Sequence, residues 1–238
     1  MTLLSLSIDA VERGLVPDAV VRAAIRRLCE QRLLDCHRGN AIANERALQM
    51  FVESMRCGPI APVPEKANEQ HYELPPEFFT AVLGPHRKYS SCFWADGTTS
   101  LGEAEAVGLE ITAARAELED GQEVLELGCG WGSLSLWMAE RFPNSRITAV
   151  SNSTPQRRFI EGEAASRGLT NLRVITADMN QFAATANGFD RVVSVEMFEH
   201  MRNWERLLER IATWLRPDGK LFVHQIGRAQ RLNSSHRT

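Results

Sequence analysis

The chain has 238 residues, a net charge of −3, 44% hydrophobic residues and 24% charged residues. These values are typical of a globular protein with room for one α/β domain and an appendage, and they do not indicate a nucleic-acid-binding surface. No apolar run approaches the ~20 residues of a membrane span, and the first residues lack a signal-peptide pattern. The five cysteines show no metal-ligand spacing, so we expect no metal site and reduced thiols in a cytoplasmic protein.

Residues 1–57 are predicted to form a helical region. Residues 17–36 carry apolar side chains at helical spacing, and a second helix is expected at about 41–55. One side of the first helix is basic, with Arg22, Arg26, Arg27 and Arg32. This side is interpreted either as a solvated face or as a peripheral contact with an anionic membrane surface or partner.

Residues 58–120 are predicted to form a linker, a lid-like segment and a leading helix. Three prolines within "CGPIAPVPEK" indicate the linker. The stretch 67–106 is dense in aromatic and histidine residues and weak in periodicity, which is typical of a lid or of a long loop. A capping-box signature at Ser100–Glu103 predicts a helix that runs to about Leu118.

Residues 121–224 alternate between strand and helix patterns, which predicts an α/β domain with a doubly wound, mostly parallel sheet. In such a sheet the ligand crevice lies at the carboxyl ends of the strands, beside the first strand–helix turn. The expected strands are 123–127, 146–151, 172–176, 189–195 and 219–224, and the expected helices are 132–142, 155–167 and 203–215.

The turn after the first strand reads "ELGCGWG", with Glu126 ahead of Gly128, Gly130 and Gly132. Glycines at this place let ligand atoms approach the main chain closely. A dinucleotide site would show G-x-G-x-x-G and an acid after the second strand, and both are absent from these stretches. The pattern instead resembles the first motif of Rossmann-like, class I methyltransferases that use S-adenosylmethionine.

Further stretches in the same order sharpen the resemblance: "ANEQHYELPPEFF", "KYSSCFW", "TTSLGEAE", "ELGCGWGSL", "AVSNSTPQ", "ADM" and "SVEMFEHMRNW". Together they are similar to the superfamily of cyclopropane-fatty-acyl-phospholipid synthases and coclaurine N-methyltransferases. The resemblance implies an enzyme with S-adenosylmethionine as its cofactor, acting on a small-molecule amine or on a lipid.

The resemblance implies that eleven residues bind the cofactor. Those at its methionyl part would be Tyr89, Ser90, Glu126, Gly128, Cys129 and Gly130. Ser151, Asn152 and Gln156 would serve the ribose, and Asp178 and Met179 would flank the adenine. Taken alone, Ser151 and Asn152 could also be turn formers, Ser153 a helix N-cap and Met179 a core residue.

The same resemblance implies that Glu199 and His200, in "FEHM" after the fourth strand, are catalytic. An alkyl amine has a pKa of ~10 and is protonated near neutral pH, so a base that holds or removes its proton is useful. A histidine titrates near that pH, and a carboxylate can orient it. The alternative is that both residues only begin a helix and bond its first N–H groups.

Methyl transfer to an amine and methylene addition to a lipid alkene are both open. Cyclopropane synthases place a cysteine directly after "YS", where it helps to hold bicarbonate; here Ser91 has that position and Cys92 follows. This difference favours the amine methyltransferase. The residues Phe78, Phe79, Phe93 and Trp94 could form an aromatic wall for a cationic acceptor, or could be ordinary core.

Residues 225–238 lose the apolar periodicity. We expect a non-native or disordered tail, with the last strands of the family's sheet missing, and an inert cofactor-binding fragment is therefore a third hypothesis. The "HQIG" stretch echoes a synthase pattern that would put His224 near the site.

Overall fold

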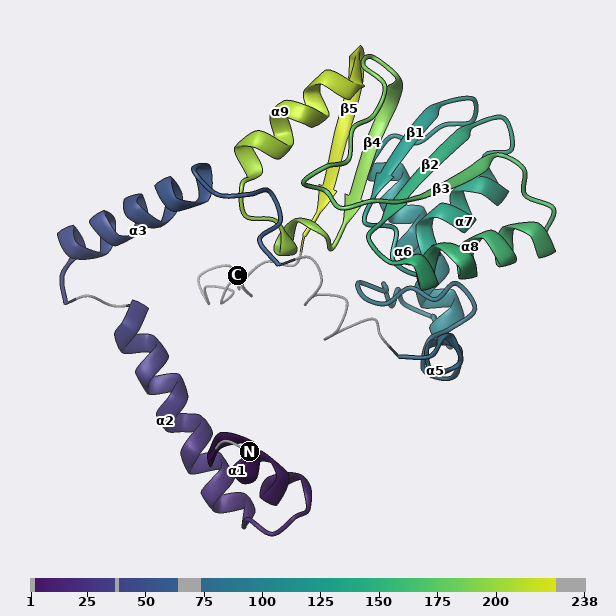
Figure 1. The fold of residues 1–238 in the computed structure, drawn as a ribbon. Helices are drawn as coiled ribbons and strands as arrows, with labels where there is room; N and C mark the ends of the chain where they lie inside the picture. Colours follow the sequence, from purple (N-terminus) through teal and green to yellow (C-terminus); the bar gives the residue numbers. More distant parts are fainter. Residues whose placement is uncertain (1–2, 37–38, 64–73, 226–238) are drawn as a thin grey trace, which may run out of the picture. The chain divides into compact units, whose positions relative to one another are not determined.

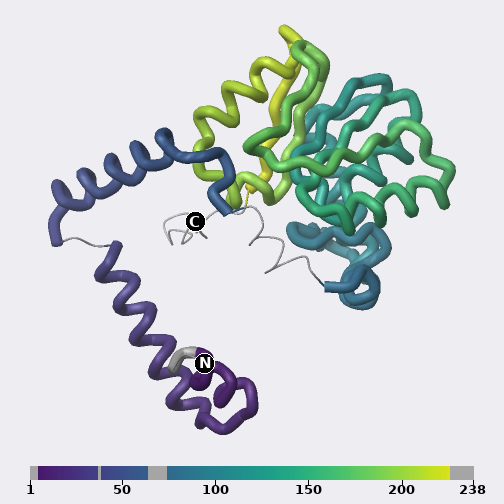
Figure 2. The backbone as a smooth tube through the Cα atoms, in the orientation of Figure 1, coloured from purple at the N-terminus to yellow at the C-terminus, as the bar shows by residue number. Residues whose placement is uncertain are grey.

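The computed structural model describes residues 3–36, 39–63 and 74–225 (Figure 1). Contacts within the chain divide it into two compact units, Met1–Ser54 and Met55–Thr238. Helices occupy the first unit, and the sheet lies in the second (Figures 1 and 2).

The first unit confirms the predicted helical region. It contains α1 (Leu3–Glu12), α2 (Asp18–Cys36) and most of α3 (Ala41–Arg56). Neither α2 nor α3 buries a residue, and the basic side of α2 includes an ion pair from Arg22 to Asp18 one turn earlier. Across the described ranges, no helix combines the length and apolar character that a membrane crossing requires.

The segment after α3 is anchored to the loop before α9 (Trp204–Trp214). Asn203 Nδ2 donates to the carbonyl oxygens of Arg56, at 2.7 Å, and Gly58, at 2.9 Å. The N–H of Arg202 donates to the carbonyl of Ile60, at 2.7 Å, and the Ile60 side chain is buried. The described part of the predicted linker is therefore held against the sheet domain, although residues 64–73 lie outside the described residues.

The described part of the expected lid-like segment contains α5 (Pro76–Val82), followed by turns up to residue 99. Its turns pack on α6 (Leu101–Arg115), where the fully buried carboxylate of Glu105 accepts hydrogen bonds from three backbone N–H groups of residues 84–88. The segment is therefore bonded to a helix of the core, and its role as a lid stays a prediction.

The capping box that opens α6 is present. Ser100 Oγ accepts from the N–H of Glu103, and the Glu103 carboxylate accepts from the N–H of Ser100. The helix ends at Arg115, three residues before the expected end, because Glu117 adopts left-handed backbone with a φ of 52°.

The sheet contains five parallel strands in the order β3-β2-β1-β4-β5 within the described residues (Figure 1). This confirms the predicted Rossmann-like fold class. The bounds of four strands agree with the sequence prediction: β1 (Glu123–Leu127), β2 (Arg146–Ser151), β3 (Leu172–Thr176) and β4 (Phe189–Val195). The connecting helices α7 (Ser133–Arg141), α8 (Thr154–Ser166) and α9 also agree within about one residue. Whether further strands follow is untested, because residues 226–238 lie outside the described residues.

The fifth strand differs from the prediction, since β5 spans Leu215–His224 and includes the stretch "LRPDG" that was expected to be a turn. Leu215 pairs with Phe189, but the next paired residues are Arg191 and Lys220. Four residues of β5 therefore bulge out opposite one residue of β4. The proline and glycine of this stretch lie within the bulge, and the strand pairing begins before them.

The two faces of the sheet are covered by different helices. Leu125 and Leu127 of β1 pack with Ile211 of α9 on one face, and Val124 packs with Met138 of α7 on the other. Figure 1 shows α9 on one side of the sheet and α6, α7 and α8 on the opposite side. This two-sided burial is what a parallel sheet requires, and it leaves the ends of the strands as the places for polar groups.

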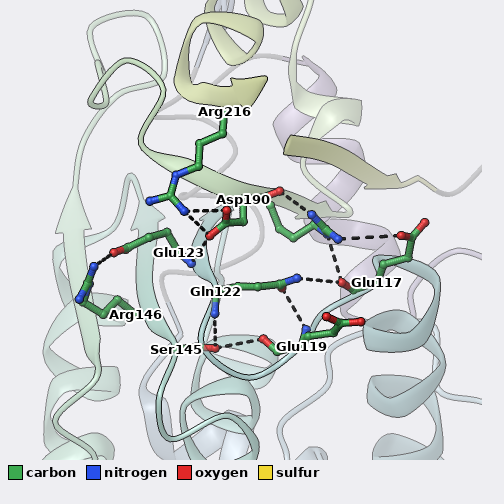
Figure 3. Close-up of polar contacts among 9 residues, drawn as sticks. Glu117, Glu119, Gln122, Glu123, Ser145, Arg146, Asp190 and Arg216 are labelled. Atoms are coloured by element: carbon green, nitrogen blue, oxygen red, sulfur yellow. Dashed lines mark hydrogen bonds and ion pairs between the residues drawn. The ribbon is translucent and has the colours of Figure 1, made fainter. Parts of the chain in front are cut away.

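A polar network joins the strands at their amino ends (Figure 3). Asp190 of β4 accepts a hydrogen bond from the N–H of Glu123 of β1, at 2.8 Å, and two from Arg216 of β5, at 2.6 and 2.7 Å. Nearby, Ser145 Oγ accepts from the N–H of Gln122 at 3.1 Å. Although burial acts against the charge, these donors hold the pKa of Asp190 below its ordinary value.

We expect Asp190→Asn to lower the free energy of unfolding by about 1–3 kcal/mol, because a charged acceptor shared by three strands is lost. Since the pKa of Asp190 is lowered in the fold, this contribution is complete above about pH 4 and is lost as the pH falls through the lowered value. Urea denaturation at several pH values measures both effects. The exposed Asp218→Asn, on the neighbouring strand β5, is the control, and an equal loss in both variants would contradict the assignment.

Candidate functional site

The carboxyl ends of the parallel strands gather the predicted site stretches at one edge of the sheet. Leu127 at the end of β1 pairs with Val150 of β2 and Ser194 of β4, and Ser151 pairs with Thr176 of β3. The glycine loop, the "SNS" turn, the "ADM" stretch and the "FEHM" stretch each continue from one of these ends. The sheet register therefore brings together segments that are up to about 70 residues apart in the sequence.

The three glycines after β1 serve different purposes. A Cβ on Gly128 would stand 2.6 Å from the Met197 side chain, and one on Gly132 would stand 2.6 Å from Ile160 of α8. Both glycines therefore allow close packing inside the protein. A Cβ on Gly130 would meet no atom within 4 Å among the described residues, so this glycine faces open space. The middle glycine is the one whose exposed backbone suits contact with a ligand.

Cys129 lies between two of these glycines, but its side chain is turned into the core. It is buried with Leu136, Ala149 and Ile160. Burial, together with the nearby charge of Glu126, raises the pKa of the Cys129 thiol well above its ordinary value. Only the backbone of this predicted cofactor residue is therefore suited to contact a ligand.

Glu126 is a buried carboxylate on the face of β1 that is covered by α7. Its Oε2 accepts a short hydrogen bond from Ser135 Oγ in the first turn of α7, and its side chain is almost completely buried. Burial raises the pKa of Glu126 to about 7, while Ser135 and the Lys88 ammonium act in the opposite direction. A cation placed beside this group would favour its ionised form.

Two buried polar atoms near the end of β2, one on α8 and one on β3, lack hydrogen-bond partners among the described residues. Ser151 Oγ donates to Gln156 Oε1 at 2.6 Å, and Ser153 caps α8 as the sequence suggested. Gln156 Nε2 and the Oγ1 of Thr176, on the neighbouring strand, are buried and lack a hydrogen-bond partner in the part of the chain that the structure describes. Buried polar atoms without partners are costly, so the pair indicates a polar ligand at this place. Asn152 is exposed.

The two residues predicted at the adenine have different surroundings. Asp178 Oδ1 accepts from the N–H and the side chain of Asn180, at 2.9 and 3.1 Å, and Asn180 in turn bonds both backbone groups of Ala61. Met179 is buried in the core on the α9 side of the sheet. Asp178 thus orders the loop after β3, and the interpretation of Met179 as a core residue is correct for its side chain.

Glu199 and His200 lie in the short 3-10 helix η1 (Phe198–His200) after β4. Glu199 is half-buried and His200 is exposed. Met197, the residue before η1, gives no side-chain cap to this turn. The alternative that Glu199 and His200 only bond N–H groups at a helix start stays open. Trp204 Nε1 donates to the carbonyl of Phe198, at 3.1 Å, which fixes η1 against α9.

A second acidic group, Glu196, lies at the same edge. It adopts left-handed backbone with a φ of 54°, an uncommon conformation for a side-chain-bearing residue. Ser91 Oγ donates to Glu196 Oε1 at 3.2 Å, and His224 Nε2 lies 3.8 Å from the same oxygen. The serine at the family's cysteine position is thus engaged with a carboxylate, and His224 does lie at this edge of the sheet.

The aromatic wall expected from the sequence forms only in part. Phe78, Phe93 and Trp94 are exposed, but Phe79 is buried and lies 4.8 Å, between ring centroids, from Trp131. Tyr89, predicted to close over the ligand, is about half exposed and lies 6.2 Å from the Phe79 ring, and Ser90 is half-buried.

Several residues of the site were not predicted. Trp131 follows Gly130 directly, and its Nε1 is buried without a hydrogen-bond partner among the described residues. Ser135 hydrogen-bonds to Glu126, and Lys88 is a buried lysine whose charge acts on Glu126. Ser135 could have been found because it lies in the first helical turn after the glycine loop; the position of Lys88 depends on long-range packing and has no local signal.

Comparisons with known proteins agree on one family. The family model described as mycolic acid cyclopropane synthetase matches residues 63–238. The (S)-coclaurine N-methyltransferase of Thalictrum flavum subsp. glaucum is 39% identical over 91% of this chain and 60% of its own length. The cyclopropane-fatty-acyl-phospholipid synthase of Escherichia coli (strain K12) is 31% identical over 67% of this chain and 40% of its own length.

A solved structure of coclaurine N-methyltransferase, bound to N-methylheliamine and SAH, superposes with a TM-score of 0.80 at 37% identity. The match covers 94% of this chain and 64% of that chain. This chain therefore spans about 60% of the length of the curated N-methyltransferases that it matches.

We expect Gly128→Ala to lower the free energy of unfolding by about 3 kcal/mol, because the new methyl collides with Met197 and the backbone is left-handed. Gly130→Ala has only the backbone penalty and is expected to cost about 1 kcal/mol. Chemical denaturation measures both losses. Gly168→Ala, with a φ of 66° and open space around it, is the matched control for Gly130→Ala. Equal losses at positions 128 and 130 would contradict the packing role of Gly128.

Proposed function

The chain belongs to the mycolic acid cyclopropane synthetase family, and we propose that it is an S-adenosylmethionine-dependent methyltransferase that acts on the amine nitrogen of a small molecule. One observation carries the proposal. The carboxyl edge of the sheet has an open backbone at Gly130, a buried carboxylate at Glu126 and orphaned polar atoms on Gln156 and Thr176. These groups suit a ligand with a cationic end and a hydroxyl-bearing end.

The residues present fit this cofactor. Glu126 would receive the ammonium of the methionyl part, which lies against the backbone near Gly130. Gln156 Nε2 and Thr176 Oγ1 would find partners in the ribose hydroxyls, which would remove the cost of leaving them unsatisfied. The remaining residues proposed at the cofactor are Tyr89, Ser90, Gly128, Cys129, Ser151, Asn152, Asp178 and Met179.

The cofactor supplies a methyl group that is already activated by its sulfonium. The protein has to align the acceptor and leave its nitrogen lone pair available. We assign that task to Glu199 and His200. They follow Met197, which packs closely against Gly128 of the glycine loop. His200 would take the proton of the amine, and Glu199 would orient the histidine or attract the cation.

Two observations support an amine acceptor over a lipid alkene. The N-methyltransferase relatives are more similar to this chain than the cyclopropane synthase is, at 39% against 31% identity. Ser91 also stands at the family's cysteine position and hydrogen-bonds to Glu196. Contact of α2 with a membrane and a cytoplasmic location stay predictions.

A transfer assay tests the function. With methyl-labelled S-adenosylmethionine, label is expected in coclaurine or a related aromatic amine, and not in vesicles of unsaturated phospholipid. His200→Ala should reduce transfer about tenfold or more while the cofactor affinity changes less than about twofold. Label in the phospholipid would favour the cyclopropane synthase, and cofactor binding without transfer to either acceptor would favour an inert binding fragment. Unchanged transfer in His200→Ala would remove the histidine from the mechanism.

Cofactor affinity should depend on the charge of Glu126. Because the pKa of Glu126 is about 7 in the protein, about half of the chains carry a protonated Glu126 at pH 7. A bound cation lowers that pKa, so cofactor binding releases a proton from Glu126. The affinity for the cofactor should therefore fall by up to about tenfold for each pH unit below 7. Calorimetry between pH 6 and 8, in buffers of different ionisation enthalpy, measures this release. Glu126→Gln should bind more weakly and without this proton release; an unchanged release would assign it to another group.

A further inference from the structure

Lys88 is a buried lysine. The residue is only 7% exposed, and within the ranges that the structure describes we find no hydrogen bond or ion pair of its ammonium. Lysines are rarely buried unless they are paired, because a desolvated charge is costly. The position therefore indicates an anionic group that is not part of the described chain.

Two buried features hold Lys88 in place. The carboxylate of Glu105, which is fully buried, accepts from the N–H of Lys88 at 3.1 Å and also from Gly84 and His86. The aliphatic part of Lys88 then crosses α6 at Gly108, where a Cβ would lie 3.0 Å from Lys88 Cε. The helix has a glycine at the point where the lysine passes, so the chain directs this side chain into the interior.

The carboxylates that act on Lys88 are hydrogen-bonded to other groups. Burial lowers the pKa of the Lys88 ammonium, while Cys92, Glu196, Glu126 and Glu105 act to raise it. Glu126 is hydrogen-bonded to Ser135, Glu196 to Ser91, and Glu105 to three backbone N–H groups. These carboxylates act on the Lys88 ammonium electrostatically, but each of them already accepts hydrogen bonds from other groups.

We propose that Lys88 binds the carboxylate of the methionyl end of S-adenosylmethionine, while Glu126 binds the ammonium of the same end. The inference rests on the proposed function. An α-amino acid end carries one positive and one negative charge close together. Glu126 and Lys88 offer the opposite charges, both buried, and they interact electrostatically without a direct ion pair. The pair therefore recognises a zwitterion.

The other role open to Lys88 is to hold Glu126 ionised without touching the ligand. The two roles differ in what they require of the ligand. A direct contact needs the ligand's carboxylate, whereas an effect through Glu126 acts on every ligand that has the ammonium.

Calorimetric titration with two ligands separates the roles. Decarboxylated S-adenosylmethionine keeps the sulfonium and the ammonium of S-adenosylmethionine and lacks only the carboxylate. The wild-type chain should bind S-adenosylmethionine about ten- to a hundredfold more tightly than the decarboxylated form, as expected for a buried charged hydrogen bond. Lys88→Met should lower this preference to less than about threefold, with no loss of affinity for the decarboxylated form.

Two further variants complete the test. Lys88→Arg keeps the charge and should retain part of the preference. Lys220→Met removes an exposed lysine at the other edge of the sheet, where it pairs with Glu117, and should behave like the wild type. Circular dichroism and thermal melts establish that each variant is folded.

Three results would overturn the inference. The wild type could bind both ligands with equal affinity, Lys88→Met could keep the full preference for S-adenosylmethionine, or Lys88→Met could lose affinity for both ligands by the same factor. The first needs no variant, so misfolding cannot hide it. If the wild-type chain binds neither ligand, the proposed function itself fails.

Discussion

The close approach of Gly128 to Met197 is the contact on which the site depends. It joins the carboxyl ends of β1 and β4, two central strands of the sheet, with only 2.6 Å between the Met197 side chain and the place that a Cβ would occupy. The sheet register places the glycine loop and the η1 segment with Glu199 and His200 at one edge, and this contact lets the two segments pack closely. A side chain at position 128 would push the two segments apart, and with them the groups assigned to the cofactor and to the acceptor.

The two edges of the sheet differ in how their polar groups are satisfied. At the amino edge, Asp190 and Ser145 bond backbone and side-chain groups from several strands, which stabilises the fold (Figure 3). At the carboxyl edge, Gln156, Thr176 and Trp131 keep buried polar atoms without partners among the described residues. An unsatisfied buried group lowers stability, so its persistence at one edge only is understandable if a ligand supplies the missing partner.

The buried charged residues differ in the same respect, since some have hydrogen-bond partners within the described residues and others have few or none. Glu105 is buried with three N–H donors and so has a structural task in holding the segment between α5 and α6. Glu126 has one donor and Lys88 has none within the described residues, although both are almost completely buried. The difference in bonding separates the charge that supports the fold from the two charges that we assign to ligand binding.

The sequence by itself determined the order and bounds of most elements and the residues at the strand ends. Periodicity and turn residues are local signals, which is why β1 to β4 and the capping box at Ser100 were predicted correctly. The bulge within β5 was missed because the pairing of Leu215 with Phe189 depends on a strand that lies 26 residues earlier in the sequence. Tertiary structure alone decided which glycine faces open space, that Cys129 points into the core, and that Lys88 lies within electrostatic reach of Glu126. Each of these is set by packing between segments far apart in the chain, and such contacts leave no periodic trace in the sequence.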